Sequence, residues 1–205
     1  MSEAAAGTIA AAIVAGGAAT RLGGRAKPAL VVGGRSIAER LLEALRATFG
    51  RVLVVANEPA PWRALGVEVT PDVHPGAGPL AGVHAALVAT AAAHPGVVCV
   101  AGDMPFVEPA LLALLRDHAP DADAVVPRVA GRAEPLLARW GRACLPVVEA
   151  RLAAGERAAH AIFEHVGTAW LDETALRSVD PALRSFANVN TPEDLRRVER
   201  ESGRS

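Results

Sequence analysis

Short apolar runs rich in Val, Ile and Ala recur along the chain, and amphipathic or polar stretches separate them. Runs of this length and composition predict buried strands. The run at 136–140 follows another strand closely and predicts one that returns antiparallel. The remaining predicted strands cover residues 9–15, 51–56, 65–70, 97–101, 123–127 and 168–171.

Helical patterns lie between these runs. Ser36 is placed to cap a helix that extends to about Phe49, with apolar residues at helical spacing on one face. Thr191 and Pro192 form an N-cap and first-turn proline for the last helix. Pro109 opens another helix in the same way. Further helices are predicted at residues 80–93, 143–154 and 157–165.

Strands that alternate with helices predict an α/β fold, with a mainly parallel sheet and helices on both faces. We expect one domain over residues 1–205, with its core at about 8–197. In such sheets, ligands bind at the carboxyl ends of the strands. The first four strands are followed by polar or glycine residues that should lie along one rim: Gly16-Gly17, Asn57, Asp72 and Asp103.

Composition narrows the functional classes. The chain is 51% apolar and 21% charged, which indicates a folded core. A formal net charge of -1 and the absence of a basic run argue against nucleic-acid binding. The longest N-terminal apolar run is too short to span a membrane. Cys99 and Cys144 have no metal-ligand spacing, so we expect two buried, reduced thiols in a cytoplasmic protein.

Lys27 is the one lysine among 21 basic side chains, the rest being arginine. Lysine provides a compact point charge that arginine does not reproduce, so a chemical role is indicated. It ends a glycine-rich loop that begins at Gly16-Gly17 and includes Arg21. Exposed backbone N–H groups and two cations suit a triphosphate. The alternative is a flexible surface turn. The spacing is neither a P-loop nor a dinucleotide fingerprint.

Four other segments are candidates, and each has a simpler alternative. Asp103 after a strand could hold Mg²⁺ or could be a turn residue. The small residues of 78–82 could support a flat base or could only begin a helix. Asn57 and Asp72 could contact base or ribose, although Asn57 also suits a turn. Asn188 and Asn190 are two of the chain's three amide side chains, yet they could be cap residues.

Together these motifs resemble the molybdenum cofactor guanylyltransferases of the MobA-like NTP transferase superfamily, over residues 9 to about 195. The resemblance rests on Val-Ala-Gly-Gly at 14–17 with Arg-Leu-Gly and Lys27, Gly-Pro-Leu-Ala-Gly at 78–82, Asp-Met-Pro-Phe at 103–106, and Asn-Val-Asn-Thr-Pro-Glu-Asp-Leu at 188–195. This chain departs from the family pattern at Val14, Leu22 and Ala26, which stand where Leu, Met and often Asp are found. It also has Arg132-Ala133-Glu134-Pro135-Leu136 where some members have His-Pro.

The resemblance implies a three-layer, Rossmann-like nucleotidyltransferase fold. It also implies transfer of GMP from GTP to molybdopterin with Mg²⁺, and possible delivery to molybdoenzyme chaperones. Lys27, Arg21 and Asp103 are the implied catalytic residues, with Asp103 on the metal and Asn188 and Asn190 on the acceptor side. The implied GTP-binding residues are Val14, Ala15, Gly16, Gly17, Lys27, Asn57, Asp72, Gly78, Pro79, Leu80, Ala81, Gly82 and Asp103.

Two alternatives remain open on the sequence. One is a related nucleotidyltransferase that uses CTP or a sugar-phosphate acceptor. The other is a non-catalytic module that binds nucleotide or a partner protein. Lys27 and Asp103 argue against the second alternative, because an inactive copy need not retain either side chain.

Overall fold

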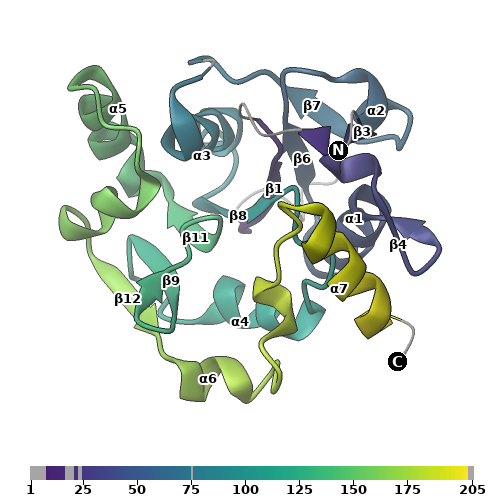
Figure 1. Ribbon diagram of the computed structural model, residues 1–205. Helices are drawn as coiled ribbons and strands as arrows, with labels where there is room; N and C mark the ends of the chain where they lie inside the picture. The colour runs from purple at the N-terminus through teal and green to yellow at the C-terminus, as the bar shows by residue number, and fades with distance from the viewer. Residues whose placement is uncertain (1–7, 17–20, 23–24, 75, 203–205) are drawn as a thin grey trace.

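The computed structural model describes residues 8–16, 21–22, 25–74 and 76–202, and for residues 21, 22, 25 and 26 only the backbone. Within this part, eight strands form one sheet in the order β10-β9-β11-β8-β1-β6-β7, with β12 paired to β9 (Figure 1). The strands are β1 (Ala10–Val14), β6 (Val52–Val55), β7 (Glu68–Thr70), β8 (Gly96–Ala101), β9 (Ala124–Val129), β10 (Arg132–Ala133), β11 (Leu137–Gly141) and β12 (Thr168–Leu171).

The strand directions confirm the predicted topology. β8, β1, β6 and β7 are parallel neighbours, so their carboxyl ends reach the same edge of the sheet. β11 runs antiparallel to both β8 and β9, as expected for the returning strand. β12 is parallel to β9 and pairs with it from Thr168 to Leu171. The sheet is therefore mainly parallel.

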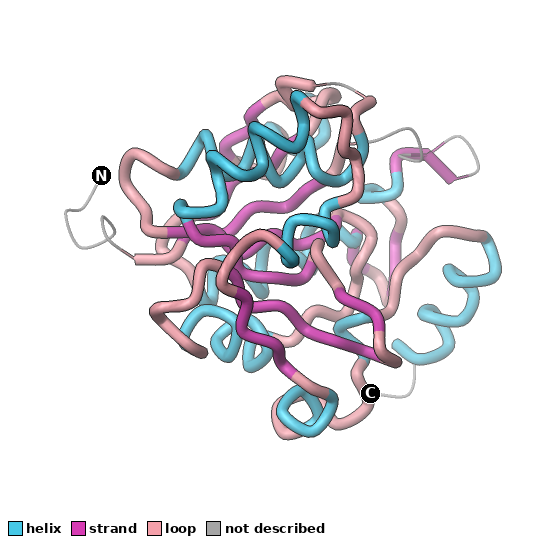
Figure 2. Tube along the Cα trace, turned by 90° about the vertical axis from the view of Figure 1, so that its left-hand side faces the viewer, coloured by secondary structure: helices cyan, strands magenta, loops and turns pink. Residues whose placement is uncertain are grey.

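Helices cover both faces of this sheet, which confirms the three-layer architecture (Figure 2). Alternate residues of β1 enter different cores. Ala11 and Ile13 pack with α1 and α4, whereas Ala12 and Val14 pack with α3 and α5. The helices are α1 (Ile37–Thr48), α2 (Ala60–Arg63), α3 (Gly78–Thr90), α4 (Pro109–Asp117), α5 (Leu145–Ala153), α6 (Glu173–Arg177) and α7 (Pro192–Ser202).

Short elements connect β1 to α1. A two-residue ladder joins β2 (Arg21–Leu22) to β3 (Arg25–Ala26). The 3₁₀ turn η2 (Lys27–Ala29) follows, and a second ladder joins β4 (Val31–Val32) to β5 (Arg35–Ser36). The other 3₁₀ segments of the described part are η3 (Arg142–Cys144), η4 (Ala159–Glu164) and η5 (Arg184–Phe186).

The predicted cap of α1 is confirmed. Ser36 Oγ accepts the N–H of Glu39 at 3.2 Å, and the Glu39 carboxylate accepts the N–H of Ser36 at 2.8 Å. This reciprocal arrangement is a capping box, which satisfies two backbone donors at the start of the helix. It fixes where α1 begins, directly after the short elements that carry Lys27.

The predicted helix at 157–165 is wrong, because the segment forms the 3₁₀ turn η4 instead. Gly155 has a φ of +89° just after α5, and the Glu156 carboxylate accepts the N–H groups of Arg157 and Ala158. These N–H groups bond a neighbouring side chain, an alternative that competes with helix formation.

Other differences concern element boundaries. The strand expected from residue 65 begins at Glu68, because the N–H groups of Leu65 and Gly66 close a turn onto α2. The helix expected at 80–93 covers Gly78–Thr90, and the helix expected at 143–154 divides into η3 and α5. The short helices α2 and α6 were not predicted.

Both cysteines are free and buried, as expected. Burial raises the pKa of the Cys144 thiol to about 12, and it raises the pKa of Cys99 further still. Both thiols are therefore protonated and unreactive at neutral pH. No helix among the described residues is long and apolar enough to cross a membrane.

Two glycines allow close approach around the carboxyl end of β1. A Cβ atom on Gly82 would collide with Cγ1 of Val14, so α3 lies directly against β1. A Cβ atom on Gly102 would lie 3.0 Å from the Cβ of Ala15. The small side chains here set the distance between the helix layer and the sheet.

We predict that Gly82→Ala destabilises the fold by about 1–3 kcal/mol, because the added methyl group overpacks the contact with Val14. Chemical denaturation of the variant provides the measurement. Val14→Ala removes the clashing carbon, so the double variant should recover part of the loss. Additive losses in this double-mutant cycle would contradict the packing assignment.

Candidate functional site

Four of the predicted residues follow adjacent parallel strands and lie along one rim of the sheet. Asp103 follows β8, Gly16 follows β1, Asn57 follows β6 and Asp72 follows β7. The Asn57 side-chain oxygen accepts the backbone N–H of Asp72 at 3.1 Å, which joins the ends of β6 and β7. A Cβ atom built on Gly16 would lie 3.8 Å from Oδ2 of Asp72. The predicted rim is therefore present.

Asp72 holds a carboxylate in a fixed position at this rim. The residue is 7% exposed, and Oδ1 accepts the N–H of His74 at 2.9 Å. Its other oxygen, Oδ2, is the atom closest to Gly16. A buried carboxylate with one oxygen directed across the rim is suited to accept hydrogen bonds from a ligand that lies over Gly16.

Lys27 lies in the same region, and its side chain is 8% exposed. Its ammonium donates to the side-chain oxygen of Asn190 at 2.5 Å and lies 3.4 Å from Oδ2 of Asp103. A buried ammonium is costly without compensation, and these two oxygens provide it. The structure thus joins three predicted residues that are far apart in the sequence.

The segment that carries Asn190 runs beside the Asp103 turn. The N–H of Val189 donates to the backbone oxygen of Asp103 at 2.9 Å. The side-chain oxygen of Asn188 is buried and has no hydrogen-bond partner in the described part of the chain. A buried amide oxygen without a partner, close to a carboxylate, is an acceptor that a cation or donor could use.

The start of α7 fixes this segment. Oγ1 of Thr191 accepts the N–H of Asp194 at 3.1 Å, and the Asp194 carboxylate accepts the N–H of Thr191 at 2.9 Å. The predicted N-cap is thereby confirmed. The same carboxylate accepts the N–H of Asn190 at 3.1 Å. This bond, with those from Thr191, lowers the pKa of Asp194 below its usual value.

The segment Gly78–Gly82 forms the first turn and a half of α3, and its residues differ in exposure. Gly78, with a φ of +77°, and Pro79 are exposed. Leu80 and Ala81 are buried in the core, and Gly82 packs against Val14. The surface that a ligand can reach is therefore the Gly78–Pro79 corner. The conformational freedom of glycine is required there, because φ is positive.

Two predicted residues lie wholly or partly outside the described part of the chain. Gly17 lies outside the described residues. Arg21 is described by its backbone alone, in the ladder with Ala26. Ala15 extends β1 towards the rim and donates its N–H to Val55 at 2.9 Å.

The structure places two further segments near the rim, neither of which holds a predicted site residue. The backbone oxygen of Arg157 accepts the N–H of Leu80 at 3.3 Å, so the loop after α5 contacts the start of α3. The oxygen of Leu136 accepts the N–H of Ala101 at 2.7 Å, which places the Glu134 segment beside the end of β8. Burial raises the pKa of Glu134, although Arg132 opposes the shift. The sequence signal for this segment was its difference from the family pattern at residues 132–136.

The described part of the chain holds no metal site made entirely of protein ligands. Among the described residues, no group of three or more His, Cys, Asp or Glu side chains could hold a metal ion. Mg²⁺, however, is often bound by one or two carboxylates together with substrate phosphates and water. Asp103, with the Asn190 side-chain oxygen nearby on the same Lys27 ammonium, fits this second type of site.

Comparison with known proteins identifies the family. The model of the MobA-like NTP transferase domain matches residues 11–172. The chain belongs to this family. A molybdenum cofactor guanylyltransferase of Desulfosudis oleivorans is 32% identical over 91% of this chain and 92% of its own length. The corresponding Rhizobium meliloti protein is 37% identical over 91% of this chain and 88% of its own length.

Solved structures agree with the family assignment. The molybdopterin-guanine dinucleotide biosynthesis protein A of Archaeoglobus fulgidus superimposes with a TM-score of 0.82 and 29% identity, over 96% of this chain and all of that chain. A cytidylyltransferase of Thermus thermophilus, which acts on 2-C-methyl-D-erythritol 4-phosphate, shares the fold with a TM-score of 0.71 and 21% identity, over 96% of this chain and 99% of its own. The expected family and nucleotidyltransferase fold are confirmed.

We predict that Thr191→Ala loosens the start of α7, because loss of an N-cap costs about 1 kcal/mol. Hydrogen exchange of the α7 amides should accelerate by about fivefold as a result. Thr174→Ala is the matched control, since Thr174 lies exposed in the first turn of α6 and its hydroxyl makes no cap bond. Equal effects of the two substitutions would contradict the capping role.

Proposed function

We propose that the protein transfers GMP from GTP to the terminal phosphate of molybdenum-bearing molybdopterin. The products are the molybdopterin guanine dinucleotide cofactor and pyrophosphate. The observation that carries the proposal is the buried Lys27, held between Asp103 and Asn190 at the rim. The names of the relatives, which match most of the chain, support this reaction over others of the superfamily.

On the nucleotide side, the base lies over Val14–Gly16 and the exposed Gly78–Pro79 corner. Asn57 and Asp72 lie next to this surface, at the carboxyl ends of β6 and β7. Asn57 holds the backbone of Asp72, and Asp72 directs Oδ2 towards Gly16. Guanine presents two adjacent N–H donors, and Oδ2 of Asp72, the oxygen not bonded to His74, has lone pairs that can accept both. Cytosine offers no equivalent pair, so Asp72 favours GTP.

On the phosphate side, Lys27 and Arg21 hold the triphosphate. The Lys27 ammonium already lies in a largely water-excluded position, where its charge acts more strongly on an approaching phosphate than it would in water. Asp103 and Asn190 keep it in place before substrate arrives. Pre-positioned charge of this kind needs little reorganisation during the reaction.

The acceptor phosphate attacks the α-phosphorus, the new P–O bond forms, and the bond to pyrophosphate breaks. The attacking group is already anionic, so no strong general base is required. Catalysis then depends on alignment and on neutralisation of charge. Since the nucleotide occupies the β1, β6 and β7 side of the rim, the acceptor approaches from the β8 and β11 side, near Asn188 and Glu134.

Mg²⁺ is the proposed metal. Asp103 would hold it, and the side-chain oxygen of Asn190 lies close by, on the Lys27 ammonium that also contacts Asp103. The ion supplies charge neutralisation for the phosphates when it is bound. We also assign this reaction to the cytoplasm, where GTP is available.

The test is pyrophosphate release by the purified protein with Mg²⁺ and molybdenum-loaded molybdopterin, with GTP compared with CTP. Release with GTP alone supports guanylyl transfer. Release with CTP alone would keep the mechanism and overturn the base assignment. Nucleotide binding without release would indicate another acceptor or a non-catalytic binding module.

We predict that Lys27→Ala reduces turnover by about 10²-fold or more, because it removes a charge directed at the transition state. Lys27→Arg should recover part of the rate, since it restores charge but not shape. Arg46→Ala is the control, because Arg46 is an exposed cation that bonds the oxygens of Leu65 and Gly66. Near-normal turnover in Lys27→Ala would refute the assigned role.

We predict that Asp103→Asn raises the Mg²⁺ concentration needed for half-maximal turnover, because an amide binds the ion more weakly than a carboxylate does. The measurement is a Mg²⁺ titration of pyrophosphate release at saturating GTP. Asp117→Asn is the matched control, since Asp117 is exposed on α4 and pairs with Arg116. An unchanged titration in Asp103→Asn would exclude this residue as the metal ligand.

A further inference from the structure

Two histidine rings contact each other next to the segment that carries Asp72. The ring centres of His74 and His84 lie 5.3 Å apart, and the rings are tilted by 45°. His74 follows Asp72 by two residues and is exposed, whereas His84 lies in α3 and is 7% exposed. The proposed reaction assigns no role to either side chain.

His84 has a polar partner on one side of its ring. The carboxylate of Glu149, on α5, lies 3.6 Å from Nε2 of His84. A carboxylate on that side assigns the proton of a neutral imidazole to Nε2, which leaves Nδ1 as an acceptor. Nδ1 is buried, and no residue of the described chain forms a hydrogen bond with it. The acceptor is therefore in place but unused.

Another buried histidine shows a satisfied arrangement. His94 is 3% exposed, and its Nδ1 lies 2.7 Å from the backbone oxygen of Thr8. An unpaired buried acceptor lowers stability, and an apolar side chain of similar size would fill the same position without that cost. The imidazole of His84 is therefore best explained by a donor that reaches Nδ1 when a ligand is bound.

His74 can supply that donor. A ring nitrogen lies roughly 1 Å from its ring centre, so nitrogens turned towards each other across this 5.3 Å contact would be about 3 Å apart, within hydrogen-bond distance. Rotation of an exposed side chain is fast and needs no change of the backbone. The bond can thus form without movement of α3.

His74 also holds the carboxylate of Asp72. Its backbone N–H donates to Oδ1 of Asp72 at 2.9 Å, and Oδ2 of the same carboxylate is directed towards Gly16. The backbone oxygen of His74 accepts the N–H of Ala77 at 3.0 Å, which closes the turn before Gly78. A fixed His74 therefore fixes both the carboxylate and the corner beside which the base is proposed to lie.

We propose that His84 is a positioning residue for the nucleotide: its Nδ1 accepts the ring N–H of His74, and this bond holds Asp72 in place for the base. The inference rests on the proposed function, because it takes the base to lie against Asp72. The bond forms in the nucleotide-bound state. His84 does not touch the substrate and acts through His74.

The first test is NMR of the full wild-type chain with isotope-labelled histidine, before and after saturation with Mg²⁺ and GTP. Imidazole nitrogen signals report which nitrogen carries the proton and which accepts a hydrogen bond. We expect His84 to keep its proton on Nε2, and its Nδ1 signal to move away from that of a free acceptor when GTP binds. An unchanged Nδ1 signal with GTP bound would overturn the inference.

The same experiment separates this inference from the proposed function. If the wild-type chain does not bind GTP, both are overturned. If GTP binds and moves the Nδ1 signal but no pyrophosphate is released with molybdopterin, the inference stands and the proposed reaction does not.

Variants provide the second test, with GTP affinity measured by calorimetry. His84→Leu keeps an apolar side chain of similar size but removes the acceptor, so GTP should bind about fivefold more weakly, as expected for the loss of one hydrogen bond. His84→Asn should recover part of the affinity, because its side-chain oxygen can take the place of Nδ1. His94→Leu is the matched control, since it removes a buried imidazole that precedes β8, whereas Asp103 follows that strand. It should leave GTP affinity unchanged.

Inorganic triphosphate separates an effect on the base from a general loss of structure. It carries the phosphates without the base, so His84→Leu should leave its affinity unchanged. In a His74→Ala background, His84→Leu should have little further effect on GTP affinity, because both changes remove the same hydrogen bond. Independent effects of the two substitutions, or equal weakening of GTP and triphosphate binding, would overturn the inference.

Discussion

The burial of β1 on both faces and both edges is the constraint on which the rest of the structure depends. Ala10, Ala11, Ala12 and Ile13 are fully buried, and β6 and β8 pair with the strand on either side. A strand enclosed in this way must be apolar throughout, so it carries no chemistry itself. Its carboxyl end instead emerges at the middle of the rim, where backbone is the only group it can offer. The small residues around that end let α3 and β8 approach closely enough to form a site there.

The buried charge of Lys27 determines how the distant parts of the chain come together. An ammonium that is 8% exposed requires oxygen partners, and one of them, Asn190, lies 163 residues away in the sequence. The family model ends at residue 172, so the C-terminal segment that completes the lysine's environment lies beyond the matched part. The pairing therefore gives residues 188–202 a structural reason to dock beside Asp103. It also fixes Lys27 and Asp103 relative to each other.

Much of this fold could be predicted from local sequence patterns, because helix caps form through hydrogen bonds between residues that are close in the chain. Ser36 and Thr191 cap helices through bonds that span three residues, so sequence spacing alone identifies them. The rim could be predicted from the order of strands and helices, because residues that follow adjacent parallel strands lie at the same edge of the sheet. The Lys27–Asn190 contact could not be predicted as a pair, because it depends on how α7 docks. The role of Gly82 as a packing residue also needed coordinates, since a glycine at a helix start suits a ligand equally well.

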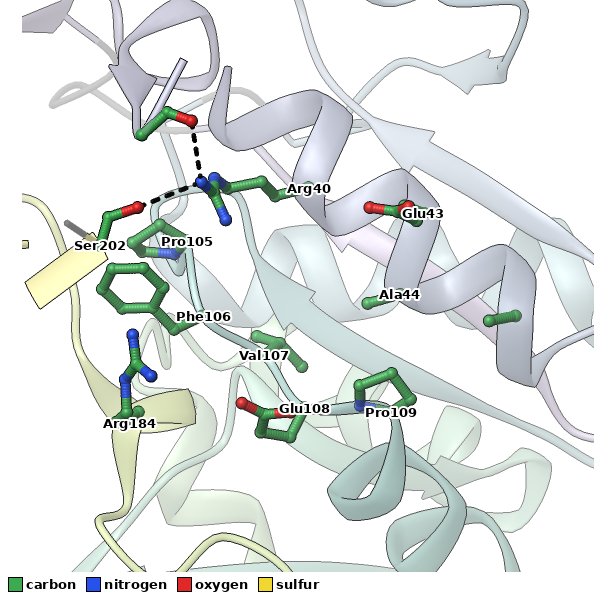
Figure 3. Close-up of a pocket in the computed structure, with 12 residues that line it drawn as sticks. Arg40, Glu43, Ala44, Pro105, Phe106, Val107, Glu108, Pro109, Arg184 and Ser202 are labelled. Atoms are coloured by element: carbon green, nitrogen blue, oxygen red, sulfur yellow. Dashed lines mark hydrogen bonds between the residues drawn. The ribbon is translucent and has the colours of Figure 1, made fainter. Parts of the chain in front are cut away.

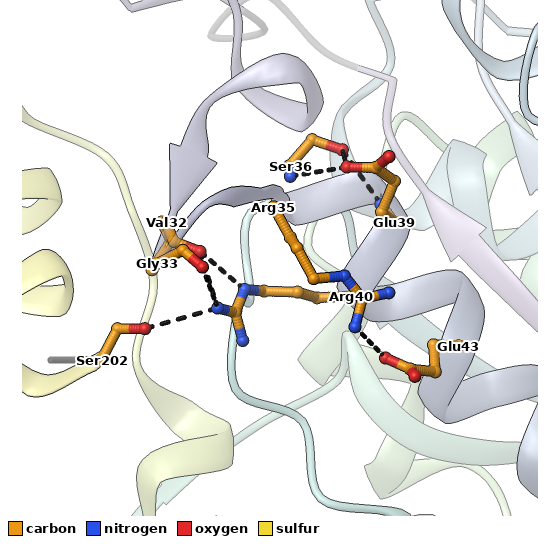
Figure 4. Close-up of polar contacts among 8 residues, drawn as sticks. All are labelled: Val32, Gly33, Arg35, Ser36, Glu39, Arg40, Glu43 and Ser202. Atoms are coloured by element: carbon orange, nitrogen blue, oxygen red, sulfur yellow. Dashed lines mark hydrogen bonds and ion pairs between the residues drawn. The ribbon is translucent and has the colours of Figure 1, made fainter. Parts of the chain in front are cut away.

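Polar contacts hold both ends of helix α7. Its first turn is bonded to Asn190 beside Lys27, whereas its last residue, Ser202, contacts Arg40 of α1 (Figure 3, Figure 4). Eleven residues of helix span roughly 16 Å, so one element reaches from the rim to Arg40 on α1. Val198 is buried in the core, and Leu195 is partly buried against the same core. The position of α7 is therefore set by this apolar contact together with the polar contacts at its two ends.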